Sequence, residues 1–134
     1  MKKHVLICLL CFSCLFCGCS LQADNEEKIR DIEFTVLDKQ LIPEELNEYI
    51  KEQGEAPFEI TFGDEGYLYI AKGYGRQEST GYSIEVEECY ETEGRIYVST
   101  GLLGPPKEEE ILEHSTFPYI VIKMEYSEKN VVFK

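Results

Sequence analysis

Apolar and polar residues alternate with a period of two over residues 32–38 and over most of the chain beyond residue 57. This alternation is typical of β-strands that turn one face to a core, and turn-forming or charged residues separate the runs. The predicted strands cover residues 32–38, 58–62, 67–73, 81–90, 95–103, 118–126 and 131–133. The segment 67–73 is apolar on both faces, which indicates a central strand.

A helical period separates the first two of these strands. Leu46, Tyr49 and Ile50 are spaced i, i+3 and i+4, so they share one face of a helix. Pro43 suits the first helical position, and Gly54 suits the position where a helix stops. The sequence therefore predicts one short helix near the start of the folded region.

The length of 134 residues allows one domain with a core of modest size. Short strands that recur with Gly-rich turns are typical of antiparallel sheets and sandwiches. We therefore predict a mainly β fold of the β-rich α+β kind, a small antiparallel sheet or sandwich with one short N-terminal helix packed on it. We expect this domain to span residues 32–134.

The first twenty residues have a different organisation. Lys2 and Lys3 precede the uncharged apolar stretch Val5–Cys17, and small residues and then a polar segment follow. That order is the layout of a secretory signal peptide. The stretch is shorter than the ~20 apolar residues that span a bilayer, so a transmembrane helix is not predicted.

Most of the cysteines lie inside this segment, at positions 8, 11, 14, 17 and 19. Their spacing also suits an iron–sulfur cluster, and cysteines in an exported chain also suit a disulfide framework. Apolar residues fill the spaces between them, however, and only Cys89 lies elsewhere to pair with. Because cysteine behaves as a small hydrophobe, the signal-peptide interpretation is favoured.

The end of the apolar stretch, Phe16–Cys19, resembles the lipobox of bacterial lipoproteins, although Phe16 and Cys17 depart from its usual residues. The resemblance implies cleavage after Gly18 and attachment of a diacylglyceryl group to the Cys19 sulfur. Residues 1–18 would then be removed, and residues 19–31 would form a lipidated tether. It also implies a protein anchored in the cell membrane and facing the extracytoplasmic side.

The chain is acidic, with 13 Lys and Arg residues against 26 Asp and Glu residues and a net charge of −13. This charge disfavours nucleic acid, because phosphates would be repelled. It also disfavours a basic patch for anionic lipid head groups. We therefore expect the partner to be another exported protein, with a basic surface among the options.

Few residues are suited to catalysis. His114 and Cys89 suit a thiol–imidazole pair, but neighbouring glutamates would raise the pKa of the Cys89 thiol. The acidic run Glu108–Glu110 lacks the spacing of a calcium loop. We predict no catalytic residue, no metal, no cofactor and no small-molecule substrate.

Residues 72–83 hold the most distinctive interior pattern. Two glycines there lack the further glycine of a dinucleotide-binding loop. The stretch is consistent with a long hairpin connection whose glycines allow positive φ. It is also consistent with a partner-binding loop, because Tyr74, Arg76, Thr80 and Tyr82 are side-chain types that anchor protein interfaces. The residues alone leave both interpretations open.

The run from residue 67 to residue 123 resembles the C-terminal domain of the PrcB protease-complex subunit family. The positions that match its motifs are Gly75, Thr80, Gly81, Tyr82, Ser83, Pro105 or Pro106, Thr116, Pro118 and Tyr119. The proline and one glycine of the family's Pro-Thr-Gly-Gly-Tyr pattern are missing, since this chain has Glu78, Ser79 and then Thr80–Tyr82.

The resemblance implies a non-enzymatic lipoprotein that assists or stabilises an exported protease complex, with a protease or its propeptide as partner. Two loops are the expected contact surfaces: residues 74–82, with Tyr74, Gly75 and Arg76, and residues 101–106, with Gly104. Two alternatives stay open. The stretch Ser79–Tyr82 is similar to a loop of chagasin-like cysteine-protease inhibitors, and a purely structural envelope lipoprotein has the same sequence features.

Overall fold

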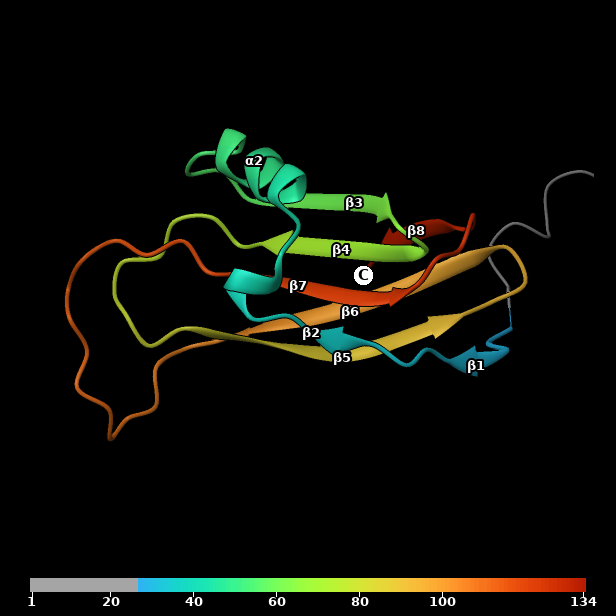
Figure 1. The fold of residues 1–134 in the computed structure, drawn as a ribbon. Helices are drawn as coiled ribbons and strands as arrows, with labels where there is room; N and C mark the ends of the chain where they lie inside the picture. The colour runs from blue at the N-terminus through green and yellow to red at the C-terminus, as the bar shows by residue number, and fades with distance from the viewer. Residues whose placement is uncertain (1–26) are drawn as a thin grey trace, which may run out of the picture.

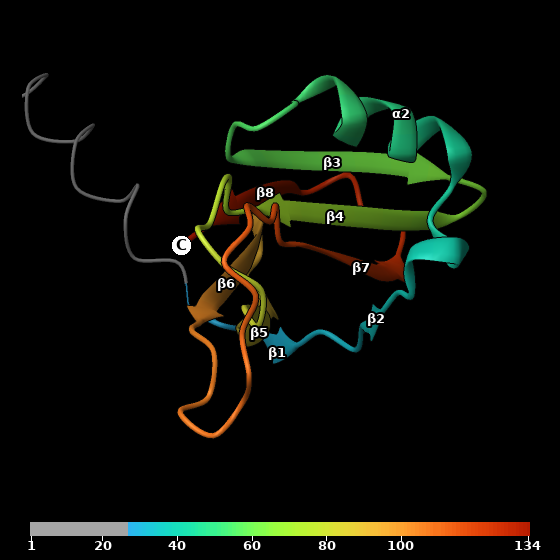
Figure 2. The ribbon, with the colours of Figure 1, turned by 90° about the vertical axis from the view of Figure 1, so that its left-hand side faces the viewer.

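The computed structural model describes residues 27–134. Its elements are β1 (Arg30–Asp31), β2 (Thr35–Val36), the 3-10 helix η2 (Lys39–Leu41), α2 (Glu44–Glu52), β3 (Phe58–Asp64), β4 (Tyr67–Gly73), β5 (Ser83–Glu91), β6 (Arg95–Leu103), β7 (Tyr119–Glu125) and β8 (Asn130–Phe133). The strands form two sheets, sheet A in the order β1-β5-β6-β8 and sheet B in the order β2-β7-β4-β3. Figures 1 and 2 show the helix lying over one side of sheet B and sheet A on the other side. The mainly β fold with one short helix is confirmed.

The space between the two sheets holds the larger core. It buries Leu68, Ile70, Cys89, Ile96, Val98, Ile120, Ile122 and Met124. Half-buried apolar residues from both ends of the chain, Phe34 and Phe133 among them, pack against this cluster. Because β4 and β7 are the two inner strands of sheet B, their alternate residues supply most of its half of this core.

A second core lies between sheet B and α2. Leu46 and Ile50 of the helix are buried against Tyr69 and Val121 of the sheet. Strand β4 is therefore apolar on both faces because each face meets a different layer, as predicted for a central strand. Tyr49, which shares the helix face, is 44% exposed and reaches only the rim, where its ring lies 6.3 Å from that of Phe62.

The predicted helix ends are close to the observed ones. Pro43 is the N-cap residue and not the first helical residue. Gly54 follows the C-cap residue with a φ of +62°, the left-handed conformation that favours glycine after a helix. Within residues 27–134, no helix combines the length and apolar character needed to cross a membrane.

The predicted first strand, residues 32–38, is wrong in its extent. The chain forms two strands of two residues each, β1 in sheet A and β2 in sheet B. Between them it crosses from one sheet to the other, and Ile32 and Phe34 pack against the core as it passes. We call residues 32–38 the strap. Alternation in the strap thus reflects packing against the core and not continuous pairing.

Two strand relationships also differ from the prediction. Strands β6 and β8 run parallel, whereas all the other pairs are antiparallel as predicted. The β5–β6 pair shifts register between Val86 and Glu88. This β-bulge adds one residue, so Cys89 turns its side chain to the core although strict alternation from Val86 would place Glu88 there.

Candidate functional site

Two long connections lie side by side at one end of the sandwich, on the left of Figure 1. Residues 74–82 join β4 to β5, and residues 104–118 join β6 to β7. The Gln77 amide donates a hydrogen bond of 2.8 Å to the Thr116 carbonyl, and the Thr116 amide returns one of 3.0 Å. We call these two segments the paired loops. The expected hairpin connection is wrong, because β4 and β5 belong to different sheets.

Threonine side chains fasten the paired loops further. The Thr80 hydroxyl accepts a hydrogen bond of 2.9 Å from the Leu112 amide, while the Thr80 amide donates one of 3.1 Å to the Leu112 carbonyl. The Thr116 hydroxyl donates one of 2.7 Å to the Ser79 carbonyl. Where the loops meet β4 and β7, the Tyr74 amide donates a hydrogen bond of 3.1 Å to the Pro118 carbonyl. These bonds hold the irregular main chain in one arrangement.

Glycine is required at two positions of the first loop. Gly75 has a φ of +75° and Gly81 a φ of +95°, a region that other residues enter only with strain. A Cβ atom on Gly75 would lie 3.0 Å from the Pro57 ring. A Cβ atom on Gly81 would lie 2.6 Å from the Cβ of Pro105, which is closer than atoms can pack. Thus Gly81 lets the two loops touch.

The residues predicted to contact a partner have different roles in the structure. Tyr74 is half-buried, and its hydroxyl shares a hydrogen bond with the Thr100 hydroxyl on β6, so it ties the first loop to sheet A. Arg76 is exposed, and its nearest acidic partner is Glu78 at 3.9 Å. Tyr82 is half-buried beside a shallow hollow of about 230 Å³.

The second set of predicted residues divides in the same way. Pro105 is half-buried against Gly81, whereas Gly104 and Pro106 are exposed. Tyr119 belongs to β7, where it packs against the helix-side core. Burial raises the pKa of its hydroxyl. Most of the motif residues therefore hold the paired loops or the core, and few of them are presented to solvent.

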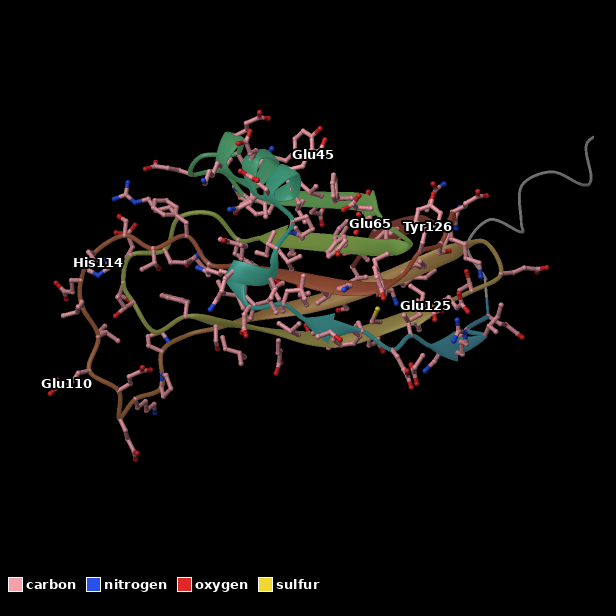
Figure 3. The ribbon with its side chains drawn as sticks, viewed as in Figure 1. Glu45, Glu65, Glu110, His114, Glu125 and Tyr126 are labelled. Atoms are coloured by element: carbon pink, nitrogen blue, oxygen red, sulfur yellow. The ribbon has the colours of Figure 1, made fainter. Side chains whose placement is uncertain are left out.

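The sequence reasoning missed a group of exposed apolar side chains on and beside the paired loops. They are Leu103, Ile111, Leu112 and Phe117, with exposed fractions of 44%, 42%, 64% and 40%. Their only signal in the sequence is that apolar residues occur in a charged, non-periodic segment. The same two loops carry exposed acidic side chains, Glu78, Glu108, Glu109, Glu110 and Glu113. Figure 3 shows Glu110 and His114 projecting outward from this end.

A broad open cleft of about 1160 Å³ lies elsewhere, along the strap and the end of β7. Its lining mixes apolar residues such as Phe34 with charged ones. Its two basic groups have partners: Arg30 pairs with Glu91, and the Lys123 ammonium lies 3.9 Å from the centre of the Tyr67 ring. Glu33 and Glu125 also line the cleft, and neither forms an ion pair within 4.0 Å among the described residues.

The thiol–imidazole pair that the sequence suggested is not assembled. The Cys89 side chain is buried in the core, and the Cys89 carbonyl accepts a hydrogen bond from the Ile32 amide. His114 is exposed on the paired loops, at the opposite end from β1 (Figure 3). Residues 27–134 also contain no group of three or more histidine, cysteine, aspartate or glutamate side chains that could hold a metal ion.

Burial, with a smaller contribution from the charge of Asp31, raises the pKa of the Cys89 thiol from about 9 to about 11. Near pH 8, the native thiolate fraction is then about 100-fold below that of an unfolded chain. We expect iodoacetamide to modify Cys89 slowly in the native protein and rapidly in denaturant, as measured by mass spectrometry of the Cys89 peptide.

The same shift makes stability depend on pH. Between about pH 9 and pH 11 the unfolded state loses the Cys89 proton while the folded state keeps it, so stability falls over this window as pH rises. The loss that Cys89 causes is about 3 kcal/mol, and a Cys89→Ala variant should lack it. Equal alkaline destabilisation of both proteins would contradict this expectation.

Comparison with known proteins supports one assignment. Residues 68–125 match the family model described as PrcB C-terminal, a segment that runs from β4 through β7 and includes the paired loops. Neither a curated protein nor a solved structure matches the chain. The resemblance of Thr80, Gly81, Thr116 and Pro118 to the motifs of that family thus coincides with the residues that join the two loops. The match thus identifies residues 68–125 as a PrcB C-terminal domain, as the motif residues had indicated.

Proposed function

We propose that this protein is an exported, membrane-anchored lipoprotein whose β domain binds another exported protein and thereby assists or stabilises a protease complex. The PrcB C-terminal domain supports an association with such a complex. In this proposal the domain is not an enzyme, and the paired loops are its contact surface. The partner is a protease or its propeptide.

The main support for the proposal is that the paired loops have a hydrogen-bonded main chain but exposed apolar side chains. The Leu112 amide and carbonyl are both bonded to Thr80, yet its side chain is 64% exposed. Phe117 lies between two fastened residues, Thr116 and Pro118, and is 40% exposed. Apolar groups that the main chain holds in place in solvent lose little conformational entropy when a partner covers them.

The surrounding charge constrains the partner. The paired loops carry five exposed glutamates, at positions 78, 108, 109, 110 and 113, against two exposed basic residues, Arg76 and Lys107. When two protein surfaces carry complementary electrostatic potentials, they associate faster, and partners of the wrong charge bind less well. We therefore expect a partner surface with an apolar centre and a basic rim, in agreement with the net charge of −13.

Replacing Leu112 and Phe117 together by serine should weaken capture of the partner at least ~10-fold, since anchor side chains at interface centres dominate binding. Folding should be retained, because the hydrogen bonds of the paired loops use main-chain atoms and threonines. The measurement is crosslinking and pull-down from membranes, with the captured protein identified by mass spectrometry.

Tyr126→Ser is the matched control. Tyr126 is 55% exposed but lies beyond the other end of β7, away from the paired loops (Figure 3). The control should capture the partner at the wild-type level. Undiminished capture by the Leu112→Ser, Phe117→Ser protein would remove the paired loops from the proposal. Strong inhibition of papain by the purified protein would instead favour the inhibitor alternative.

The membrane anchor rests on Cys19 and Gly18, which lie outside the described residues. Cys19→Ala should remove lipid attachment and shift the protein from the membrane fraction to the soluble fraction. Two buried acyl chains contribute about 0.8 kcal/mol per methylene, so their loss should abolish stable anchoring. Cys17→Ala serves as the control, because it lies in the segment proposed to be removed. Unchanged fractionation of the Cys19→Ala protein would contradict anchoring at this residue.

A further inference from the structure

Strand β5 has an open edge. On one side it pairs with β6 along its length, but on the other side β1 pairs only with Tyr90 and Glu91. The last main-chain bond from the strap to β5 joins the Ile32 amide to the Cys89 carbonyl at 2.9 Å. Within residues 27–134, no strand pairs with the outer edge of Ser83–Glu88. An edge of this kind offers main-chain donors and acceptors to another strand.

The open edge is acidic. Glu85, Glu87 and Glu88 are all exposed. A Cβ atom on Gly101 of β6 would lie 2.9 Å from a carboxylate oxygen of Glu87 and 3.7 Å from one of Glu85, so these two carboxylates lie together over the β5–β6 pair. Among the described residues, neither forms an ion pair within 4.0 Å, and Glu88 has only Lys134 at 3.9 Å.

The chain itself shows how this edge receives a strand. In β1, Arg30 lies directly opposite Glu91 of β5, and its guanidinium donates to the Glu91 carboxylate. Lys129 also contacts that carboxylate, at 3.2 Å. Hydrogen bonds from these cations hold the pKa of Glu91 below its usual range. A strand on the edge of β5 is thus accompanied by a basic side chain opposite a glutamate, but the strap leaves before the other glutamates are reached.

We propose that the open edge of β5, Ser83–Glu88, binds an extended segment of the partner protein as an added β-strand that places lysine or arginine side chains opposite Glu85, Glu87 and Glu88. The inference rests on the proposed protein-binding function and names the chemistry of the segment bound. A second copy of this chain does not fit the same edge, because identical edges would bring the glutamates together.

The position of the edge agrees with the proposed contact surface. Strand β5 begins at Ser83, directly after the first of the paired loops. Leu112 is hydrogen-bonded to Thr80, three residues before Ser83, so the apolar contact and the start of the open edge belong to neighbouring parts of the chain. The β-bulge at Val86–Glu88 disfavours pairing of this edge with the edge strands of unrelated proteins. The glutamates of β5 then favour a segment that carries basic side chains.

A peptide probe tests the inference without the natural partner. The purified full-length protein is titrated with a fluorescent, end-capped peptide that alternates lysine and valine, and binding is followed by anisotropy. Three further peptides are compared: one alternating glutamate and valine, one with lysine and valine in non-alternating order, and the lysine–valine peptide N-methylated at every residue. N-methylation keeps the charge and removes every main-chain donor.

Two variants complete the design. Glu85→Lys with Glu87→Lys reverses the charge of the edge, and Glu48→Lys with Glu52→Lys makes the same change on exposed positions of α2, which lies on the far side of sheet B. We expect the lysine–valine peptide to bind wild type and the α2 variant equally, and to bind the edge variant about tenfold more weakly. The edge variant should instead bind the glutamate–valine peptide, a gain that misfolding cannot produce.

N-methylation should abolish binding to all proteins. Binding that survives full N-methylation, or that is equal for the non-alternating peptide, would show diffuse charge attraction and overturn strand addition. Absence of binding, or equal binding to the edge variant, would also overturn it. Failure of the peptide test with continued loss of partner capture in the Leu112→Ser, Phe117→Ser protein would refute the edge and leave the paired loops as the contact surface.

Discussion

Replacing Ile70 by alanine should lower the free energy of unfolding by about 4 kcal/mol, because a buried isoleucine truncated to alanine loses its transfer free energy and leaves a cavity. Ile70 is 1% exposed and lies in β4, directly opposite Ile122 of β7. Both side chains belong to the cluster between the sheets. A domain of this size is stable by roughly 5–15 kcal/mol, so the variant should be close to unfolding at physiological temperature.

Val36→Ala is the matched control for this prediction. It also truncates a β-branched residue in a strand of sheet B, but Val36 is 53% exposed. A surface change of this kind should alter stability by no more than about 0.5 kcal/mol. Urea unfolding followed by circular dichroism compares the three proteins. Similar losses in both variants would mean that the space between the sheets is not the principal core.

Gly81→Ala should destabilise the protein by about 2–3 kcal/mol, the combined effect of a strained φ and a steric clash. The φ of Gly81 is +95°, and its new Cβ would lie 2.6 Å from Pro105. Because Pro105 belongs to the second of the paired loops, relief of the clash requires the loops to separate. We therefore expect faster proteolytic cleavage within residues 104–118 and weaker partner capture, although Leu112 and Phe117 are unchanged.

Substitutions at two other glycines distinguish the effect of backbone strain from that of the steric clash. Gly54 has a φ of +62° with no atom within 4 Å of an added Cβ, so Gly54→Ala should cost about 1 kcal/mol from strain alone. Gly104 has open space and no positive φ, so Gly104→Ala should be nearly neutral. Denaturant unfolding and limited trypsin digestion of all three variants provide the comparison. A Gly81→Ala protein as stable and as protease-resistant as Gly104→Ala would show that the loops do not depend on this contact.

These effects clarify the resemblance to the family motifs. In the sequence, Tyr74, Thr80 and Gly81 suit a partner-binding loop as well as a structural turn. The structure gives Tyr74 a bond to Thr100, and Thr80 a bond to Leu112. Substituting Tyr74 would therefore test folding together with binding. The exposed Leu112 and Phe117 are the better positions for a binding test.

Some features of this protein follow from the sequence by itself. The periods of two and of 3.6 located β3 to β7 and α2 within a few residues, because they depend on neighbours close in the chain. Apolar residues on both faces identified β4 as a central strand for the same reason. The motif residues from Gly75 to Tyr119 identified the domain, and the family match over residues 68–125 agrees.

Only the tertiary structure decided the rest, since it depends on contacts between residues far apart in the chain. The strap alternates like a strand, yet only Thr35–Val36 within it forms a strand, in sheet B, while Ile32 and Phe34 pack against the core as the chain crosses from sheet A. The bulge in β5 depends on its register with β6.

The paired loops depend on Thr80 meeting Leu112 and Gly81 meeting Pro105, contacts across a sequence gap that no local pattern encodes. The open edge of β5 exists because β1 ends where the strap turns away. Local sequence thus determined which segments are strands and helix. Long-range packing determined which of their edges and side chains remain for a partner, because exposure is a property of the assembled sandwich.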